Sequence, residues 1–157
     1  MTEFKKGEGK KLYLSPIMDL VTGEILSFSI SHRPDLSFVT ESLHGVLLLL
    51  EQAKYRTTIH SDKGWQYQHK KWGKTLKNHK IFQSMSRKGN CLDNSPMENF
   101  FGILKQEMYD EKQFKTYEEL EQAIKDYIDY YNHKRIKTKL AGISPVQYRI
   151  HTSQQAA

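Results

Sequence analysis

The order of apolar patterns along the chain constrains its fold more than any other feature. Residues 12–18 and 24–31 alternate in the way typical of strands, with a turn at Thr22-Gly23 between them. Apolar side chains then recur at helical spacing over residues 36–54, which predicts an amphipathic helix. The segments that follow predict a short strand at 57–60, a helix at about 67–78 and a strand at 81–85. This order predicts an α/β fold with a mixed sheet flanked by helices.

Two capping patterns predict helices in the second half of the chain. Residues 95–98 read Ser-Pro-Met-Glu, a capping box with a proline in the first turn, so Ser95 is the expected N-cap. Residues 116–119 repeat the capping pattern and predict a helix to about residue 131. A basic linker at 133–139 follows, and Ser144-Pro145 predicts a last short helix.

The positive charge of the chain is concentrated in one segment. The 157 residues contain 24 Lys and Arg against 18 Asp and Glu, a net charge of +6. Residues 63–88 hold eight basic and no acidic side chains, and aromatic residues lie among them: Trp65, Tyr67, Trp72 and Phe82. Such a segment can neutralise phosphates while its rings stack on bases. The alternative is a solvated helix face with aromatic residues in the core, but nucleic acid is the favoured partner.

Other classes of protein are disfavoured by what the sequence contains. The longest apolar run, residues 46–50, is far too short to span a membrane, and no basic and then apolar leader precedes it. Cys91 is the single cysteine, so no internal disulfide forms, which fits a reducing cytoplasm. Cys91, His69 and His79 lack the spacing of a zinc site. We expect a cytoplasmic protein with no membrane partner.

Two carboxylates stand where phosphoryl-transfer chemistry would need them. Asp62 follows the C-terminal end of a short apolar strand, and Glu98 lies in the first turn of a helix, with 35 residues between them. Carboxylates from different elements suit Mg²⁺ or Mn²⁺, because these hard ions prefer oxygen ligands. Each acid also has a purely structural explanation, as a turn residue for Asp62 and as the capping box partner for Glu98.

The sequence segments around these acids, and one near the end of the chain, resemble one family. They are IHSDKGWQY around Asp62, SMSRKGNCLDNSPMENFFGILKQE around Glu98, and YIDYYNHKRIKTKLAGISPVQY near the end. Together they are similar to the integrase-type catalytic core of bacterial insertion-sequence transposases. The resemblance covers residues 2 to about 149 and implies the ribonuclease-H-like fold of retroviral integrases. It implies an integrase-like core over residues 1–132 and a basic C-terminal extension with a short helix over 133–157.

The resemblance also implies roles for individual residues. Asp62 and Glu98 match the second and third acids of the D-D-E triad, and so are the expected catalytic and metal-binding residues. Lys105 matches a basic position that contacts DNA in the family, although a plain exposed lysine is the alternative. The full set of expected DNA-binding residues comprises Lys63, Lys70, Lys71, Lys74, Arg87, Lys88, Lys105, Lys134 and Arg135.

The first acid of the triad has no clear match. Met1-Thr2-Glu3-Phe4 resembles the end of a TDVTEF segment, which would place the aspartate immediately before Met1. Glu3 lies at an odd offset from that position, so its side chain should point to the opposite face. Asp19 ends the next strand and is a disfavoured alternative ligand, and Asp93 fits a turn or cap better than a fourth ligand. On this register the core is truncated, its first strand is largely missing and Mg²⁺ or Mn²⁺ binds weakly if at all.

These observations predict a transposase catalytic core that cleaves DNA and transfers strands with a divalent metal, with activity impaired by the absent aspartate. The alternative is a non-catalytic DNA-binding or oligomerising remnant of a transposase. DNA is the expected partner, together with a homo-oligomeric copy of the chain as a second candidate partner. A ribonuclease-H-type nuclease shares the fold and metals, but the 35-residue spacing and its flanking words favour a transposase.

Overall fold

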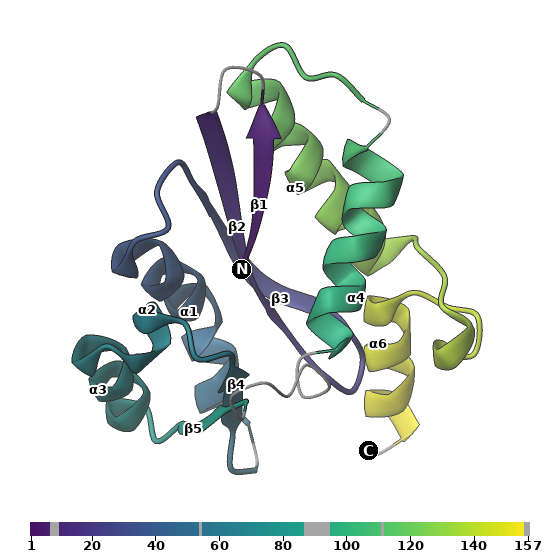
Figure 1. The fold of residues 1–157 in the computed structure, drawn as a ribbon. Helices are drawn as coiled ribbons and strands as arrows, with labels where there is room; N and C mark the ends of the chain where they lie inside the picture. The colour runs from purple at the N-terminus through teal and green to yellow at the C-terminus, as the bar shows by residue number, and fades with distance from the viewer. Residues whose placement is uncertain (7–9, 54, 87–94, 111, 156–157) are drawn as a thin grey trace.

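The computed structural model describes residues 1–6, 10–53, 55–86, 95–110 and 112–155. Five strands form two sheets (Figure 1). Strands β1 (Thr2–Lys6), β2 (Lys10–Met18) and β3 (Ile25–Ser31) form an antiparallel sheet in that order. Strands β4 (Thr58–Ser61) and β5 (Phe82–Met85) form a separate parallel pair.

Helical segments connect and cover the strands. In sequence order, the helix α1 (Leu36–Glu51) follows β3 and precedes β4. The helices α2 (Trp65–Gln68) and α3 (Lys70–Asn78) connect β4 to β5. The C-terminal half comprises α4 (Ser95–Leu104), the π-helix η2 (Lys105–Tyr109), α5 (Tyr117–His133), the 3₁₀-helix η3 (Thr138–Leu140) and α6 (Pro145–Gln155). None of the helices in the described part of the chain is long and apolar enough to cross a membrane.

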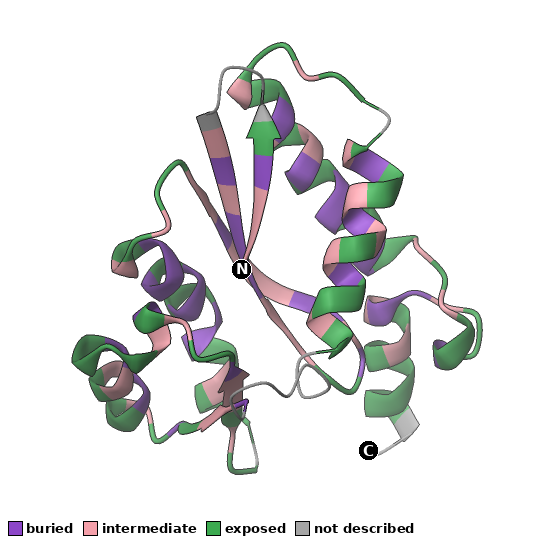
Figure 2. Cartoon of the chain, in the orientation of Figure 1, coloured by how far each residue is buried: buried purple, intermediate pink, exposed green. Residues whose placement is uncertain are grey.

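The antiparallel sheet separates two apolar cores because successive side chains of a strand point to opposite faces. Phe4, Leu12 and Leu14 point to the face covered by α4, η2 and α5, where they join one core. Tyr13 and Ile17 pack on the other face, against a core built mainly by α1 and α3. Figure 2 shows the buried sides of α1, α4 and α5 turned toward the sheet. The result is a helix–sheet–helix arrangement.

Close contacts fix the helices on the two faces of the sheet. A Cβ added at Gly45 of α1 would collide with Ser27 Oγ of β3, so the glycine lets the helix approach the sheet closely. On the other face, Tyr109 of η2 packs its ring on Phe4 at 5.2 Å, and its hydroxyl accepts a hydrogen bond from Lys5 N at 3.0 Å. The π-helical turn η2, which is wider than an α-helix, therefore carries the tyrosine that bonds directly to β1.

The structure confirms the predicted α/β order with small differences in boundaries. Thr116 caps α5 through the expected box with Glu119, and the segment 67–78 is two helices broken at His69. The structure describes α4 from Ser95 onward, and the residues directly before it lie outside the described part of the chain. The expectation that the first strand is largely missing was too strong: Thr2–Lys6 form five pairs with β2, because Phe4 is fully buried in the core.

Candidate active site

Asp62 lies directly after β4, exposed at the mouth of a cavity. Its Oδ1 accepts a hydrogen bond from Gly64 N at 2.8 Å, which closes the turn into α2. The cavity has a volume of about 290 Å³. Its walls come from β2, β4 and α1, from Tyr67 and Trp72, and from Pro96 and Met97 at the start of α4. The predicted strand end therefore does present its acid to a concave site.

Glu98 belongs to the same region but does not line the cavity itself. It lies in the first turn of α4, one residue after Met97, and its side chain is exposed. The positive end of a helix favours a carboxylate at this position. Within the described residues, no cluster of three or more His, Cys, Asp or Glu side chains is arranged to hold a metal ion. The structure thus brings Asp62, Asp19 and the start of α4 to one cavity, with Glu98 one residue beyond the lining.

The electrostatic environment of Asp62 acts on two neighbouring groups. Burial lowers the pKa of the Met1 amino group, and the negative charge of Asp62 partly opposes this shift. Burial raises the pKa of Tyr67 to about 12, and Asp62 adds to the shift. Met1, Asp62 and Tyr67 all line the same cavity.

Asp19 and Glu3, the other acids considered near the site, have structural partners. Asp19 lines the cavity, but its carboxylate accepts hydrogen bonds from Val21 N, Thr22 N and the Thr22 hydroxyl, the last at 2.7 Å. These bonds are those of a turn residue. Glu3 pairs with Lys11 at 2.9 Å on the sheet face opposite Phe4.

His60 contributes to the site in a way that the sequence did not reveal. Its two ring nitrogens lie 3.0 Å from Ser84 Oγ and 2.9 Å from Ser86 Oγ, so the ring ties β4 to β5 just before Asp62. The only signal in the sequence was the alternation of polar residues in two short strands, and parallel pairing of those strands could not be read from it. His60 thus stabilises the strand end that presents Asp62.

The aromatic and the basic residues of the segment 63–88 differ in their surroundings. Trp72 is 2% exposed and Tyr67 is half-buried, so these rings belong to the core, whereas Trp65 is 58% exposed. Phe82 is also exposed, and the Arg56 guanidinium stacks on its ring. The lysines of α3 lie on its solvent face, and no ion pair involves them among the described residues; they are Lys70, Lys71, Lys74 and Lys77. Lys63 is exposed beside Asp62.

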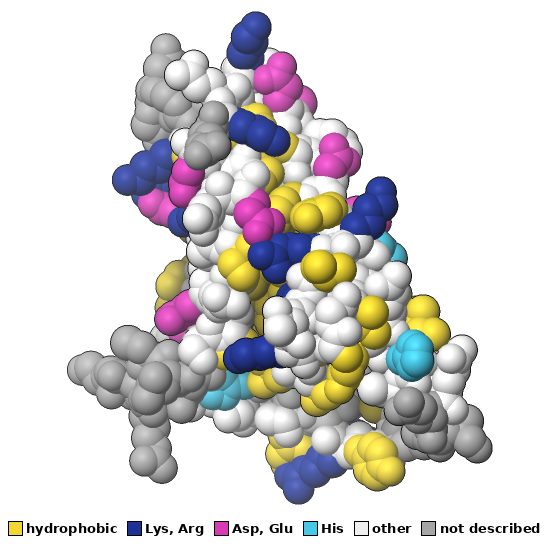
Figure 3. Space-filling model, turned by 90° about the vertical axis from the view of Figure 1, so that its right-hand side faces the viewer, with side chains coloured by type: hydrophobic (Ala, Val, Ile, Leu, Met, Phe, Trp, Pro, Cys, Tyr) yellow, Lys and Arg dark blue, Asp and Glu magenta, His cyan; other side chains and the backbone are white. Residues whose placement is uncertain are grey.

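The other expected DNA-binding residues have mixed surroundings. Lys105 is half-buried with its Nζ 5.8 Å from the centre of the Phe4 ring, and Lys134 is exposed at the end of α5. The Arg135 guanidinium is held by Glu107, with its Nη2 2.6 Å from Oε1. Arg87 and Lys88, like Asp93 and Cys91, lie outside the described residues. Figure 3 shows the face that carries α4, α5 and α6, where basic side chains are dispersed around hydrophobic ones.

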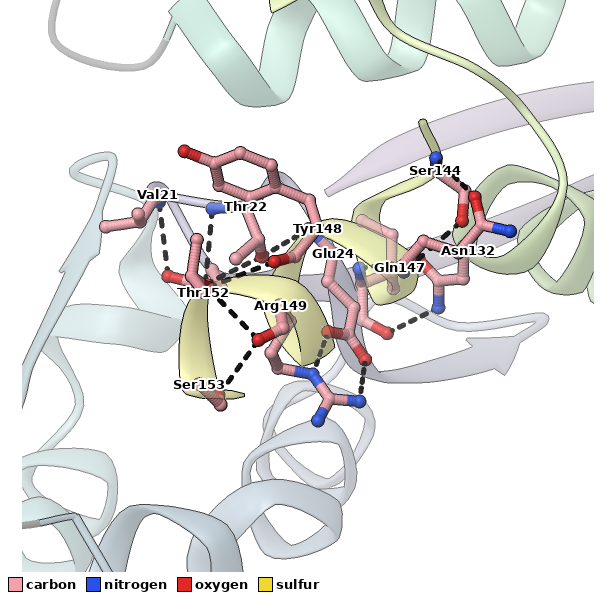
Figure 4. A network of polar contacts seen from close by, with 12 residues as sticks. Val21, Thr22, Glu24, Asn132, Ser144, Gln147, Tyr148, Arg149, Thr152 and Ser153 are labelled. Atoms are coloured by element: carbon pink, nitrogen blue, oxygen red, sulfur yellow. Dashed lines mark hydrogen bonds and ion pairs between the residues drawn. The ribbon is translucent and has the colours of Figure 1, made fainter. Parts of the chain in front are cut away.

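Polar residues near the end of the chain hold the C-terminal helices against the sheet. Asn132 is buried and bonds both backbone groups of Ile25, its Oδ1 accepting from the N–H and its Nδ2 donating to the carbonyl, each at 2.9 Å. Arg149 of α6 donates to the buried Glu24 carboxylate at 2.6 Å (Figure 4). These two attachments hold the end of α5 and the middle of α6 beside the β2–β3 turn.

Comparison with known families accounts for this arrangement. The family described as integrase core domain matches residues 1–91, and a second model with the same description matches residues 98–152. The chain belongs to the integrase core domain family. The first match contains Asp62 and the second contains Glu98, so each acid lies in an integrase core segment.

Relatives of this integrase core are transposases of bacterial insertion sequences. An uncharacterized transposase-like protein of Haemophilus influenzae is 52% identical over 149 residues, 95% of this chain and 68% of the relative. The putative transposase InsK for IS150 of Escherichia coli is 45% identical over 152 residues, 97% of this chain and 53% of the relative. The transposase for IS904 of Lactococcus lactis is 34% identical and is spanned over 60% of its length.

Solved integrase structures share the fold at low sequence identity. The HTLV-2 integrase catalytic core domain in complex with magnesium, in its trimeric form, matches with a TM-score of 0.66 and 17% identity. The match covers 94% of this chain and 90% of that one. A chain of the simian T-cell lymphotropic virus intasome matches with a TM-score of 0.75 and 20% identity, over 94% of this chain and 51% of that one. The expected ribonuclease-H-like fold is thereby confirmed.

Proposed function

We propose that this integrase core is the catalytic core of an insertion-sequence transposase, acting on DNA by cleavage and strand transfer at phosphodiester bonds. The observation that carries the proposal is that Asp62 and the start of α4, which bears Glu98, border one cavity within an integrase core fold. The transposase relatives support DNA as the substrate.

The two acids fit a divalent metal ion incompletely. Asp62 uses Oδ1 for the Gly64 N–H, which leaves its other oxygen for a ligand, and Glu98 is exposed. Carboxylate oxygens suit Mg²⁺ or Mn²⁺, but two side chains hold such an ion less firmly than three. We propose that Asp62 and Glu98 bind the ion weakly. When bound, the ion supplies Lewis-acid stabilisation of the phosphoryl oxygens and a more acidic bound water.

The side chains of this chain would position the DNA around that site. Lys63 lies next to Asp62 in sequence, and the α3 lysines follow it on an exposed helical face. Their charges neutralise phosphates without reading bases. Trp65 follows Lys63 and precedes α3 in the sequence, and its exposed ring offers a stacking surface for an unpaired base. We propose Lys105 and Lys134 as additional phosphate contacts.

A strand-nicking assay with Mg²⁺ or Mn²⁺ tests the catalytic proposal. We expect low activity from the chain as given and higher activity from a chain extended by one aspartate immediately before Met1. In the extended chain, Asp62→Asn should abolish the gain, although Asn retains an acceptor for Gly64 N–H, and Glu98→Gln should do the same. Equal activity of the two chains would refute impairment, and activity that survives both substitutions would refute the site.

A salt titration separates specific phosphate contacts from a merely solvated helix. Replacing Lys70, Lys74 and Lys77 by Gln should reduce the slope of log affinity against log salt by roughly three, since each lysine neutralises about one phosphate. Replacing Lys112 and Lys125, which lie on other segments, serves as the control. An unchanged slope would dismiss α3 as a DNA-binding surface. Salt-dependent binding without nicking in the aspartate-extended chain would favour the non-catalytic alternative.

We further propose that residues 1–132 form the core and 133–157 a C-terminal extension, and that the core associates with a second copy of itself. Exposed apolar side chains on α1, Leu48 at 74% and Leu49 at 55%, support an interface. Light scattering should detect a concentration-dependent dimer that Leu48→Glu weakens. A monomer at all concentrations would refute this association.

A further inference from the structure

The amine of Lys137 occupies a recess between the segment that follows α5 and the β2–β3 turn. The backbone of this lysine is fixed, because its N–H donates to the Ile143 carbonyl at 3.2 Å and its carbonyl accepts from Leu140 N at 2.9 Å. Its Nζ donates a hydrogen bond to the buried Tyr131 hydroxyl and lies 4.2 Å from the centre of that ring. On another side, a Cβ added at Gly23 would lie 2.7 Å from Nζ. The side chain is thus held, half-buried, in one place.

No carboxylate neutralises this amine. Among the described residues, Lys137 makes no ion pair. The two acids of the neighbouring turn are engaged elsewhere: Asp19 accepts from the amides of its own turn, and Glu24 accepts from Arg149 (Figure 4). The charge that does act on the amine is the positive guanidinium of Arg135, two residues earlier in the chain.

These surroundings favour the neutral amine over the ammonium ion. Burial removes water that would stabilise the positive charge, and the like charge of Arg135 adds to this effect, so the pKa of Lys137 falls from 10.5 to about 8. Burial raises the pKa of Tyr131 to about 12, so its hydroxyl stays neutral in this range. Because the Tyr131 oxygen accepts one N–H, the lone pair of the neutral amine remains free. Lys137 can therefore act as a nucleophile at mildly basic pH.

The charge and shape around the amine indicate the class of reactant. Lys134 and Lys139 are exposed on either side of Lys137 in the sequence, and the sequence contains no acidic residue after Asp129. A region of this sign attracts an anionic reactant. Gly23 and the ring contact close two sides of the amine, so a compact reactant reaches it more easily than a bulky one. Acyl phosphates of low mass are anionic, compact and electrophilic.

We propose that Lys137 is a site of acylation by small acyl phosphates. The neutral amine attacks the acyl carbon and forms an amide C–N bond. The bond from that carbon to the bridging phosphate oxygen breaks, and inorganic phosphate leaves with the electron pair and takes up the proton that the amine releases. The product is an uncharged amide, so the segment 133–139 loses one positive charge. Acylation thereby weakens the attraction of this segment for polyanions.

Acetyl phosphate is the probe, and the acetylation of each lysine in the intact chain is followed by proteolysis and mass spectrometry. At about pH 7.5 we expect Lys137 to react at least about threefold faster than the exposed Lys134 and Lys139, since a larger fraction of it is neutral. In concentrated urea the three rates should become equal, because the recess is lost. In the folded chain, the rate at Lys137 should level off above about pH 8, while the other two continue to rise.

A pair of glycine variants tests the recess itself. Gly23→Ala places a Cβ 2.7 Å from Nζ and so displaces the amine toward water. Gly142→Ala is the matched control, because both glycines have a positive φ, +70° and +76°, but nothing lies within 4 Å of a Cβ at Gly142. Gly23→Ala should remove most of the preference for Lys137, and Gly142→Ala should keep it.

The urea and pH measurements use the unaltered chain, so they stand even where a glycine variant folds poorly. Equal rates at the three lysines of the folded chain would overturn the proposal. A preference for Lys137 that persists in urea would also overturn it, because the cause would then be the local sequence and not the recess. The same holds for a rate at Lys137 that keeps rising well above pH 8, or for equal effects of the two glycine variants.

Discussion

Asn132 offers a direct test of how the C-terminal half of the chain is attached to the sheet. Its side chain is 8% exposed and bonds both the N–H and the carbonyl of Ile25, each at 2.9 Å. Asn132→Ala leaves both buried backbone groups without partners, at a cost of about 1–3 kcal/mol each. The better helix propensity of alanine offsets about 0.5 kcal/mol of this. We therefore expect a net loss of about 1.5–5.5 kcal/mol in the free energy of unfolding.

The assay is urea unfolding followed by circular dichroism, with thermal unfolding as a second measure. A loss of this size lowers Tm by about 3–22 °C for a chain of this length. Asn99→Ala on the exposed face of α4 is the matched control, and we expect it to change stability by less than about 0.5 kcal/mol. Exchange of the Ile25 amide should also accelerate in the Asn132 variant alone. A loss below about 1 kcal/mol, or equal losses in both variants, would refute the reasoning.

Three further predictions concern ionised side chains. Arg149→Met should lower the free energy of unfolding, measured in urea, by about 1–2 kcal/mol, because it removes the partner of the buried Glu24 carboxylate. The loss is limited because the Arg149 side chain is itself half exposed. Glu24→Gln should cause a smaller loss. Arg135 holds the pKa of Glu107 below its ordinary value, so Glu107 stabilises the fold above that value and the contribution is lost as pH falls through the lowered pKa. Glu107→Gln should therefore flatten the fall in stability between about pH 5 and pH 3 in acid titrations. Burial lowers the pKa of Lys137 to about 8, so the native state binds fewer protons than the unfolded state above that pH. Stability should rise from about pH 8 to pH 10, and Lys137→Met should remove that rise.

Local patterns predicted the helices and strands because those patterns are what the cores bury. The apolar positions of residues 36–54 became the face of α1 that packs on β3, with Phe38, Val39 and Leu43 all 2% exposed or less. The capping box at Thr116 formed as expected because both of its bonds are local to one turn. Contacts between residues far apart in the sequence were harder to predict from local patterns. That Thr2–Lys6 would form a full set of pairs with β2 follows from the burial of Phe4 against Tyr109, more than a hundred residues away.

The same distinction separates the parts of the site that were predicted from those that were missed. Asp62 and Glu98 were predicted as site residues from their flanking sequence segments and their spacing, and the structure places the strand end and the helix start at one cavity. His60 was missed because its partners, Ser84 and Ser86, become neighbours only through the parallel pairing of β4 and β5. The role of Asn132 was missed for the same reason, since its partner Ile25 lies 107 positions away.

The bonding of the two acids differs from that of the other named polar residues in a way that favours a functional explanation. Asn132 and Glu24 are buried and fully engaged with the fold, so folding alone accounts for them. Asp62 is exposed and makes a single turn bond, for which Asn would serve as well, and Glu98 is exposed on a helix whose apolar face lies elsewhere. Exposed side chains with so few contacts contribute little to stability. The positive end of α4 favours a carboxylate at Glu98 but does not require one, and the divalent cation that we propose would account for the negative charge at both positions.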